Sequence, residues 1–295
     1  MKPTKKIFFA LGVLFLSLSI FLAACQKDTT GDMKGSSNNA RQLSVYLTDD
    51  PCNFDSVFVD IRYVEVKIDT VRSHMDDDHH GDNDDDGDDD QHHNDSFGKW
   101  DTLAITPGVY NIMKLRNGID TLLGTATIPA GSIRKIRVTL GTNNRVVVNG
   151  VSRPLNLLAG SSNYVYIKIH KEDEDDDDNT HTSLWLDFNV CESIKLINGQ
   201  YYLKPVLKPF GKKNYGEIKG KVLPSAAHPF VIARSGSDSA TAIPENDGKY
   251  KIRGLRQGTY SVTFKATGGY RDSTLTNIQV QKNKETEIPT VTLHQ

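Results

Sequence analysis

The sequence predicts an all-β protein built from two β-sandwich domains. Val, Ile, Thr and Tyr dominate its periodic segments, which are short and separated by Gly, Pro and Asn-Gly. This pattern is typical of strands joined by tight turns. Apolar residues at helical spacing are missing from every long stretch, so we expect little helix. A chain of 295 residues is long enough for two domains of ordinary size.

The N-terminus has the charge order of an export signal. Three lysines within the first six residues precede an uncharged segment from Ile7 to Ala24, and Cys25 follows directly. Small residues before a Cys resemble a lipobox, which implies cleavage before Cys25 and a diacylglycerol on its sulfur. The alternative is an uncleaved membrane anchor, because the segment has nearly the length of a span. We expect residues 1–24 to be a signal peptide and residues 25–40 a lipidated, flexible tether.

The residues after Cys25 give an indication of where the exported protein is located. Gln26-Lys27-Asp28 resembles a short signal that sends lipoproteins to the cell surface, although an ordinary polar tether is the alternative. We expect an outer-membrane lipoprotein exposed at the cell surface and held to the membrane by its lipid. In that oxidising compartment Cys52 and Cys191 can form one disulfide, or they can remain two buried thiols.

The first domain is expected over residues 41–210. Alternating apolar residues predict strands, and a one-residue phase slip near Tyr63 predicts a β-bulge in the long strand that contains it. Asn149-Gly150 and Asn198-Gly199 predict hairpin turns. The remaining predicted strands cover residues 43–47, 57–68, 100–105, 109–115, 121–128, 133–140, 164–169 and 184–190.

Two acidic loops, residues 74–95 and 171–180, interrupt this domain. The first holds eleven Asp between Asp76 and Asp95 and no Lys or Arg, and the second is acidic at every position from Glu172 to Asp178. Since the formal net charge is only −2, the rest of the chain is basic. It shows no basic cluster or aromatic-basic stripe, so we expect no nucleic-acid partner. The second run has no ligand spacing and is expected to be a solvated tip of a hairpin.

The first acidic loop is the candidate cation site. Alternate Asp residues followed by a Gly can present several oxygens to one Ca²⁺, while the nearby His residues are ligands for Zn²⁺ or Cu²⁺. Against Ca²⁺, the position of the bidentate Glu of an EF-hand loop holds His93. The alternative is a disordered, solvated charge run. The candidate metal ligands are Asp82, Asp84, Asp86, Asp88, Asp90, His92 and His93.

Five motifs in order along the first domain resemble a known family. They are Leu47-Thr48-Asp49-Asp50-Pro51, the strand from Val57 to Val66, Pro129-Ala130-Gly131, Leu186-Asp187-Phe188 and Tyr202-Leu203-Lys204-Pro205-Val206. This series is similar to domain of unknown function 4382 (DUF4382) of bacterial lipoproteins, which implies a β-sandwich and brings no established activity. Asn189 departs from the family pattern, which more often has a second Asp there.

After a linker at residues 211–215, the segment 216–295 resembles the carboxypeptidase regulatory-like (transthyretin-like) β-sandwich. The resemblance rests on Gly216 to Val222, Asp247-Gly248 and Gly258-Thr259-Tyr260. In that family the module is accessory and carries no catalytic residue. Tyr250 and Tyr260 are expected to point inward, and Asp247-Gly248 to turn a hairpin.

Catalytic residues are not expected. Asp49, Asp50 and Asp187 could form a carboxylate pair, but an Asp before a Pro more often caps a turn. Trp100 and Trp185 could form a sugar platform, although one Trp in each of two strands more often packs in a core. The sequence therefore predicts a non-enzymatic surface protein that serves binding, adhesion or scaffolding through a glycan or protein partner. Cation binding is the alternative function, and a polysaccharide hydrolase a distant third.

Overall fold

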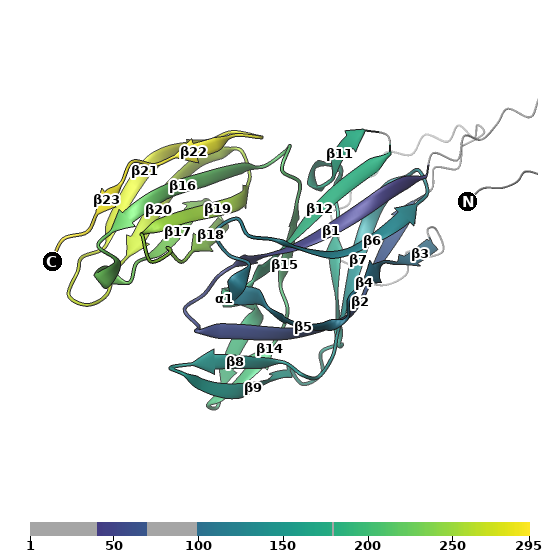
Figure 1. The fold of residues 1–295 in the computed structure, drawn as a ribbon, viewed down its shortest axis with the longest axis horizontal. Helices are drawn as coiled ribbons and strands as arrows, with labels where there is room; N and C mark the ends of the chain where they lie inside the picture. The colour runs from purple at the N-terminus through teal and green to yellow at the C-terminus, as the bar shows by residue number, and fades with distance from the viewer. Residues whose placement is uncertain (1–39, 70–98, 179) are drawn as a thin grey trace, which may run out of the picture. The chain divides into compact units, whose positions relative to one another are not determined.

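The computed structural model describes residues 40–69, 99–178 and 180–295, which belong to one compact unit. Within these residues the regular secondary structure is almost entirely strand, arranged in four sheets that pack as two sandwiches (Figure 1). The all-β fold class is confirmed. The signal peptide, the tether with Cys25, the acidic run 76–95 and all seven candidate metal ligands lie outside the described residues.

One sheet of the first sandwich runs in the order β11-β12-β1-β6-β4, and β15 also pairs with β12. In this sheet β1 and β12 are parallel neighbours, whereas β1 and β6 are antiparallel. The strands are β1 (Arg41–Asp50), β4 (Ala104–Ile105), β6 (Thr121–Ile128), β11 (Asp175–Asp178), β12 (His181–Asn189) and β15 (Leu207–Phe210).

The facing sheet runs β10-β7-β2-β8-β9-β14-β13, with β3 and β5 also paired to β2. Its strands are β2 (Ser56–Asp69), β3 (Lys99–Thr102), β5 (Gly108–Asn111), β7 (Ser132–Leu140), β8 (Arg145–Val148), β9 (Val151–Leu157), β10 (Tyr164–Lys168), β13 (Ile194–Ile197) and β14 (Gln200–Leu203).

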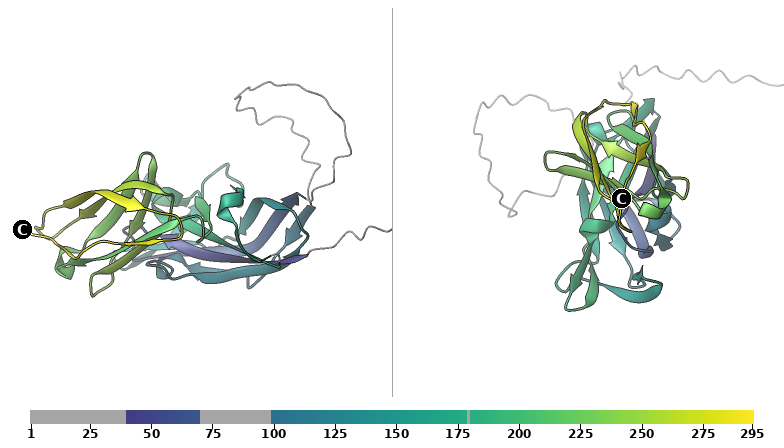
Figure 2. Two further views of the ribbon diagram at one scale, coloured as in Figure 1. Left: turned by 90° about the horizontal axis from the view of Figure 1, so that it is seen from above. Right: turned by 90° about the vertical axis from the view of Figure 1, so that its left-hand side faces the viewer.

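The second sandwich, green to yellow in Figure 2, pairs the sheet β19-β16-β22, with β23 also on β16, against β18-β17-β20-β21. Its strands are β16 (Gly216–Leu223), β17 (Phe230–Ser235), β18 (Asp238–Ala242), β19 (Lys249–Leu255), β20 (Gly258–Lys265), β21 (Ser273–Val280), β22 (Glu285–Glu287) and β23 (Val291–Thr292).

Each sandwich has its own apolar core, because side chains from both of its sheets interleave. Leu43, Val45 and Leu186 of one sheet meet Val59 and Ile136 of the other. In the second sandwich Ile218 and Ile252 meet Val262 and Phe264. The inward positions predicted for Tyr250 and Tyr260 are confirmed, since each is 3% exposed.

Helical structure in the described residues is limited to short turns: η1 (Ile112–Lys114), η2 (Lys171–Asp173), α1 (Val190–Ser193) and η3 (Ser225–Ala227). The first of these shortens a predicted strand, because β5 ends at Asn111 and the chain turns before Leu115. Among the described residues, helices with the length and apolarity of a membrane span are not found.

The predicted β-bulge and the two predicted Asn-Gly hairpin turns are confirmed. The bulge predicted near Tyr63 appears as a register shift between Ile61 and Tyr63 where β2 pairs with β7. Asn149-Gly150 and Asn198-Gly199 close the hairpins β8–β9 and β13–β14, and both residues of each pair have positive φ. Two positive φ values are what a type I′ hairpin turn requires.

Two predicted hairpins are wrong. The strands on either side of the second acidic run, β10 and β12, belong to facing sheets, so the run crosses between sheets. Similarly, the turn at Asp247-Gly248 joins β18 and β19, which lie in different sheets. In both cases the strand signals were correct, but the two strands flanking the turn belong to different sheets.

Candidate functional site

The parallel pairing of β1 and β12 brings the candidate acids together. Its register places Thr48 beside Asp187 and Asp50 beside Asn189. Because parallel strands end at the same edge of a sheet, Asp49, Asp50 and Asp187 lie near one another, and each is 9% exposed or less. From the sequence these three residues are candidates for a carboxylate pair, and the fold brings all three into one cluster.

Asp50 is fully engaged by hydrogen bonds. Thr241 of β18 donates its backbone N–H at 2.6 Å and also its hydroxyl to Oδ1, while Asn189 donates its amide to Oδ2 at 2.9 Å. Burial nevertheless raises the pKa of Asp50 to about 6, against the lowering effect of the Thr241 bonds. Asp50 therefore fastens the end of β1 to the second sandwich.

Asp49 and Asp187 are less well satisfied. Both carboxylate oxygens of Asp49, and Oδ1 of Asp187, are buried without a hydrogen-bond partner in the described part of the chain. Burial raises the pKa of each well above its usual range, and repulsion between the neighbouring carboxylates adds to it. Lys208 and Arg253 oppose the shift at Asp187.

A second set of polar contacts joins the loop before β6 to β19. Arg253 donates to the carbonyl of Gly118 and to Asp120, both at 3.0 Å, and to Glu217 at 3.1 Å. Asn117 reaches the same sandwich through the carbonyl of Ile243 at 2.9 Å. With the Asp50–Thr241 contact, these bonds fix the two sandwiches to each other at the cluster.

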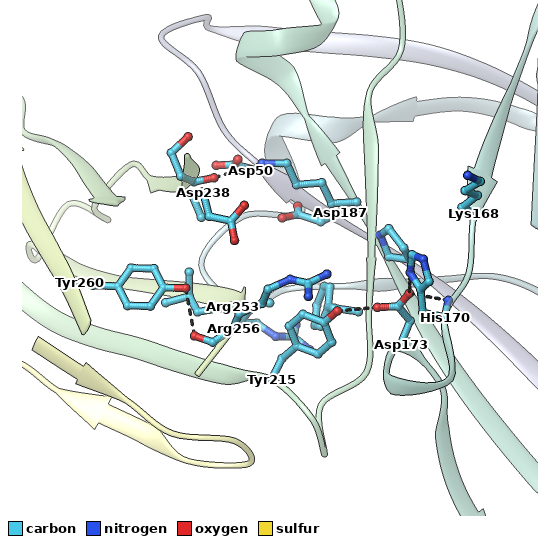
Figure 3. A pocket seen from close by; sticks show the side chains of 17 residues that line it. Asp50, Lys168, His170, Asp173, Asp187, Tyr215, Asp238, Arg253, Arg256 and Tyr260 are labelled. Carbon is cyan, nitrogen blue, oxygen red and sulfur yellow. Dashed lines mark hydrogen bonds and ion pairs between the residues drawn. The ribbon is translucent and has the colours of Figure 1, made fainter. Parts of the chain in front are cut away.

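A pocket of about 290 Å³ opens at this junction. Its lining combines acids with cations and aromatic rings, as Figure 3 shows, and Asp187 and Asp238 both face into it. We call it the junction pocket; the residues used below are Asp187, Lys208, Phe210, Tyr215, Arg256 and Tyr260, with Lys168 and His170 at one side.

Two tyrosines of the pocket are held by their hydroxyls. Tyr260 donates to the carbonyl of Arg256 at 3.0 Å, and Tyr215 donates to the carboxylate of Asp173. Burial and this carboxylate raise the pKa of Tyr215. Both rings are therefore fixed and neutral parts of the pocket wall.

The acidic run Glu172 to Asp178 is a structural element, which corrects the prediction of a solvated tip. Asp173, Glu174 and Asp175 are 1%, 3% and 4% exposed. Glu174 forms an ion pair with the buried Arg41 at 3.1 Å, and Asp175 accepts the backbone N–H groups of Lys212 and Lys213. The prediction from charge alone was wrong, because buried acids need partners and these partners lie far away in the sequence.

Arg41 is the centre of that network. Besides Glu174 it donates to Asp176 at 2.9 Å, to Thr182 at 2.8 Å and to the carbonyl of Gly131 at 2.6 Å. The first residue of β1 is thus tied to β11, to β12 and to the turn before β7.

The structure joins Cys52 to Cys191 in a disulfide, with the Cα atoms 5.0 Å apart. Each Cys follows closely on the end of its strand, two residues after Asp50 and Asn189 respectively. Of the alternatives left open by the sequence, the paired one is therefore observed. The disulfide lies beside the carboxylate cluster and links the same two strand ends.

The two tryptophans do not form a joint platform. Trp185 is 6% exposed, stacks on Tyr46 at 4.9 Å and donates its indole N–H to Asp120 at 2.9 Å. Trp100 lies in β3 of the facing sheet, next to Tyr166 at 5.8 Å. Trp185 is a packing residue, whereas Trp100 belongs to an exposed aromatic group.

Sequence reasoning missed Thr241, Arg253 and Tyr215 as members of the site. Nothing local marks Thr241, and Arg253 looks like an ordinary strand cation until its partners are known. Within the described residues, no group of three or more His, Cys, Asp or Glu side chains is arranged to hold a metal ion.

Comparison with known proteins decides the family. The domain of unknown function DUF4382 matches residues 41–205, which is more than half of the chain. The chain belongs to the DUF4382 family. The match ends before β15, so the carboxypeptidase regulatory-like resemblance of residues 216–295 stays a prediction. No curated protein matches the chain.

Solved structures give remote likenesses. A type II cohesin–X-dockerin complex from Acetivibrio cellulolyticus is 16% identical with a TM-score of 0.22, over 26% of this chain and 56% of the other. The TIE protein of Bacillus anthracis is 11% identical with a TM-score of 0.22, over 87% and 34%. The minor pilin GBS52 of Streptococcus agalactiae is 11% identical with a TM-score of 0.20, over 86% and 95%. This DUF4382 chain thus spans about half the length of the first of these structures.

Proposed function

We propose that this DUF4382 protein is a non-enzymatic, lipid-anchored protein of the cell envelope that binds a sugar in the junction pocket. The observation that carries the proposal is the carboxylate of Asp187, which faces the pocket with its Oδ1 buried and unpartnered. An unpartnered buried oxygen is costly, and a hydroxyl donated by a ligand would satisfy it.

The remaining walls suit the same ligand. Lys208 and Arg256 can donate to the oxygens of a sugar. The nearly buried Phe210, Tyr215 and Tyr260 contribute an apolar part of the pocket wall. Acids and cations both line the pocket, so a neutral polyhydroxyl ligand meets partners for its donors and for its acceptors. A simple anion or cation would meet repulsion from one of the two sets.

Binding fits the carboxylates better than catalysis does. A carboxylate pair in a glycosidase needs one group free to protonate and one free to attack or to activate water. Here Asp50 has its oxygens committed to Thr241 and Asn189. Asp49 is 7% exposed and does not line the junction pocket. Only Asp187 of the cluster is left to contact a ligand.

Anchoring is supported by the sequence alone, through the apolar run that ends at Cys25. Globomycin treatment of expressing cells, which blocks cleavage of lipoprotein signals, should accumulate the uncleaved chain. Incorporation of labelled palmitate should be lost in Cys25→Ala. Retention of the label in that variant would overturn the anchoring proposal.

The pocket is tested on a microarray of neutral and acidic glycans with the purified full chain. Asp187→Ala should weaken the glycan interaction roughly tenfold or more, because it removes a buried hydrogen-bond acceptor. Asp247→Ala is the matched control, since Asp247 is an acid of the second sandwich that does not line the pocket. Equal binding by both variants, at unchanged thermal stability, would refute the role of the pocket.

A further inference from the structure

One face of the sheet β3-β2-β7-β10 carries exposed aromatic residues. Directly paired residues share a face of a sheet, and the register aligns Tyr63 with Thr139 and Thr139 with Tyr164. The next row aligns Glu65, Arg137 and Tyr166 in the same way. We call this surface, with Trp100 of β3, the aromatic face.

The aromatic face is turned away from the core. Its tyrosines Tyr63, Tyr164 and Tyr166 are 58%, 38% and 48% exposed, whereas Val64 and Val138 on the other side of the same strands are buried. Most large exposed side chains on a protein surface stand singly. Here the rings are in contact, with Tyr164 to Tyr166 at 5.1 Å and Trp100 to Tyr166 at 5.8 Å between centroids.

An ion-paired arginine, Arg137, lies against two of these rings. The guanidinium of Arg137 lies 4.8 Å from the centre of the Trp100 ring and 5.9 Å from that of Tyr164. The same guanidinium forms a two-pronged ion pair with Glu65. Its charge is therefore balanced within the face, and its planar group contributes to a fixed surface instead of an anion site.

Strand β10 connects the aromatic face to the junction pocket. Alternate residues of a strand share a face, so Lys168 follows Tyr164 and Tyr166 on the same side of β10. Lys168 and, beyond the strand, His170 line the junction pocket. At about 3.3 Å per residue, the path from Tyr164 to His170 spans roughly 20 Å.

We infer that the aromatic face binds a neutral polysaccharide chain, which runs along β10 and ends in the junction pocket. The part of this inference that places the end of the polysaccharide in the junction pocket rests on the proposed function. The part that places its other sugars rests on the aromatic face. Aromatic rings pack against the C–H faces of successive sugars, while Lys168 and His170 can bond their hydroxyls.

Arg137 offers no free charge to a polyanion, because Glu65 already balances it. Lys135 and Lys168 are direct neighbours on the same side of β7 and β10, and their ammonium groups can donate to sugar hydroxyls. We therefore assign the face to a neutral chain, and preference for an acidic polymer would overturn that assignment.

The test measures affinity against oligosaccharide length with the full chain. The probes are neutral gluco-, xylo-, manno- and chito-oligosaccharides of one to six sugars, with oligogalacturonides as the acidic comparison. For whichever neutral series binds, affinity should increase with oligosaccharide length until the ligand has about four sugars. Tyr166→Ala should weaken binding of the four-sugar ligand roughly tenfold and leave the single sugar unchanged.

Three further variants separate this inference from the proposed function. Asp187→Ala should weaken the single sugar and the longer ligands alike. Leu196→Ala, at a 62% exposed apolar residue of β13 outside the aromatic face, should change neither. Trp100→Ala provides a second test of the face, independent of Tyr166.

The outcomes are distinct. Length-independent affinity that Asp187→Ala abolishes and Tyr166→Ala spares would overturn the inference and retain the pocket. Binding lost in Tyr166→Ala and Trp100→Ala but retained in Asp187→Ala would overturn the pocket and retain the aromatic face. Preference for oligogalacturonides, or no binding to any probe, would overturn the polysaccharide inference.

Discussion

Asp50, the last residue of β1, accepts two hydrogen bonds from Thr241 of β18, 191 positions later in the chain. Thr241 lies beyond the residues that match DUF4382. The buried acid at the edge of the family domain therefore depends on the second sandwich for donors. Separating the two sandwiches would leave Asp50 with Asn189 as its only side-chain donor among the described residues, so we expect their stabilities to be coupled.

Replacing Thr241 by Val should raise the pKa of Asp50 above its value of about 6. The hydroxyl donor is lost while the side-chain shape is kept, and a hydrogen bond to a charged group contributes about 1.5–3 kcal/mol. Carboxyl ¹³C chemical shifts measured against pH report the pKa, and chemical denaturation at pH 8 reports the loss of stability. Thr263→Val, at an exposed hydroxyl pair with Thr274, is the control. An unaltered Asp50 titration would show that the hydroxyl does not hold the carboxylate.

Replacing Asp49 by Asn should stabilise the protein more at pH 8 than at pH 4. Burial raises the pKa of Asp49 well above its ordinary 3.8, so the folded chain holds a proton that the unfolded chain releases. The stability from this group is present below pH 3.8 and is lost as pH rises through the folded-state pKa. Asn carries no charge, so the variant escapes the loss. We expect a gain of about 1–3 kcal/mol at pH 8.

The matching measurement is the free energy of unfolding of both proteins from pH 4 to pH 8. Asp247→Asn has the opposite expected sign, because Lys249 lowers the pKa of this exposed acid. The stabilisation from ionised Asp247 is present above its ordinary pKa and is lost as the pH falls. Asp247→Asn should therefore lower the stability at high pH and have little effect at low pH. A constant difference between the Asp49 variant and the native chain across this pH range would contradict the assigned shift.

Local sequence signals predicted the elements better than their partners. The bulge at Tyr63 and the two Asn-Gly hairpins depend on neighbouring residues, and the structure has them where the pattern put them. The burial of Glu174 depends on Arg41, 133 positions earlier, and that of Asp173 on Tyr215, 42 positions later. A run of acids looks solvated in sequence, because the residues that neutralise it are distant.

The candidate site shows the same limit. Asp49, Asp50 and Asp187 could each be picked out as acids in or beside strands, but sequence does not reveal that β1 and β12 pair in parallel. Their grouping follows from topology. Likewise, Tyr164 and Tyr166 were recognisable as strand residues, while their contact with Trp100 needs the order β3-β2-β7-β10.

Removing Arg41 should destabilise the first sandwich by about 3–5 kcal/mol, the cost of leaving a buried charge without its partner. In Arg41→Ala the fully buried Glu174 loses its 3.1 Å ion pair and keeps only the 3.6 Å pair with the exposed Lys171. Arg134→Ala is the control, since Arg134 is 62% exposed in its pair with Asp69 and should cost about 1 kcal/mol or less. Urea denaturation of both variants tests the difference. Equal losses would mean that the Arg41 network contributes no more than a surface pair.

The cation-binding alternative is testable without disturbing the fold. Calorimetric titration of Ca²⁺, then of Zn²⁺, should compare the native chain with one in which residues 76–95 are replaced by Gly and Ser. The second acidic run must stay, because Asp173 to Asp175 are buried. A site at the first run predicts saturable binding tighter than about 0.1 mM that the replacement abolishes. Weak heats that salt suppresses would assign the run to solvated charge.

Loss of the disulfide should loosen the edge where the carboxylates meet. Cys52 and Cys191 close a loop with a sequence separation of 139, and cross-links of this kind contribute about 2–5 kcal/mol. Cys52→Ser with Cys191→Ser should lower the free energy of unfolding by this amount. Dithiothreitol should lower the stability of the native chain and leave the variant unaffected.

This loss should also depend on Thr241. Cys52 follows Asp50 by two residues, so the disulfide and the Thr241 hydrogen bonds restrain the same strand end, and neighbouring restraints are not additive. In a double-mutant cycle, the combined loss from Thr241→Val and the two Cys→Ser changes should differ from the sum of the separate losses by 0.5 kcal/mol or more, roughly. Strict additivity would show that the disulfide and the Thr241 contact act independently.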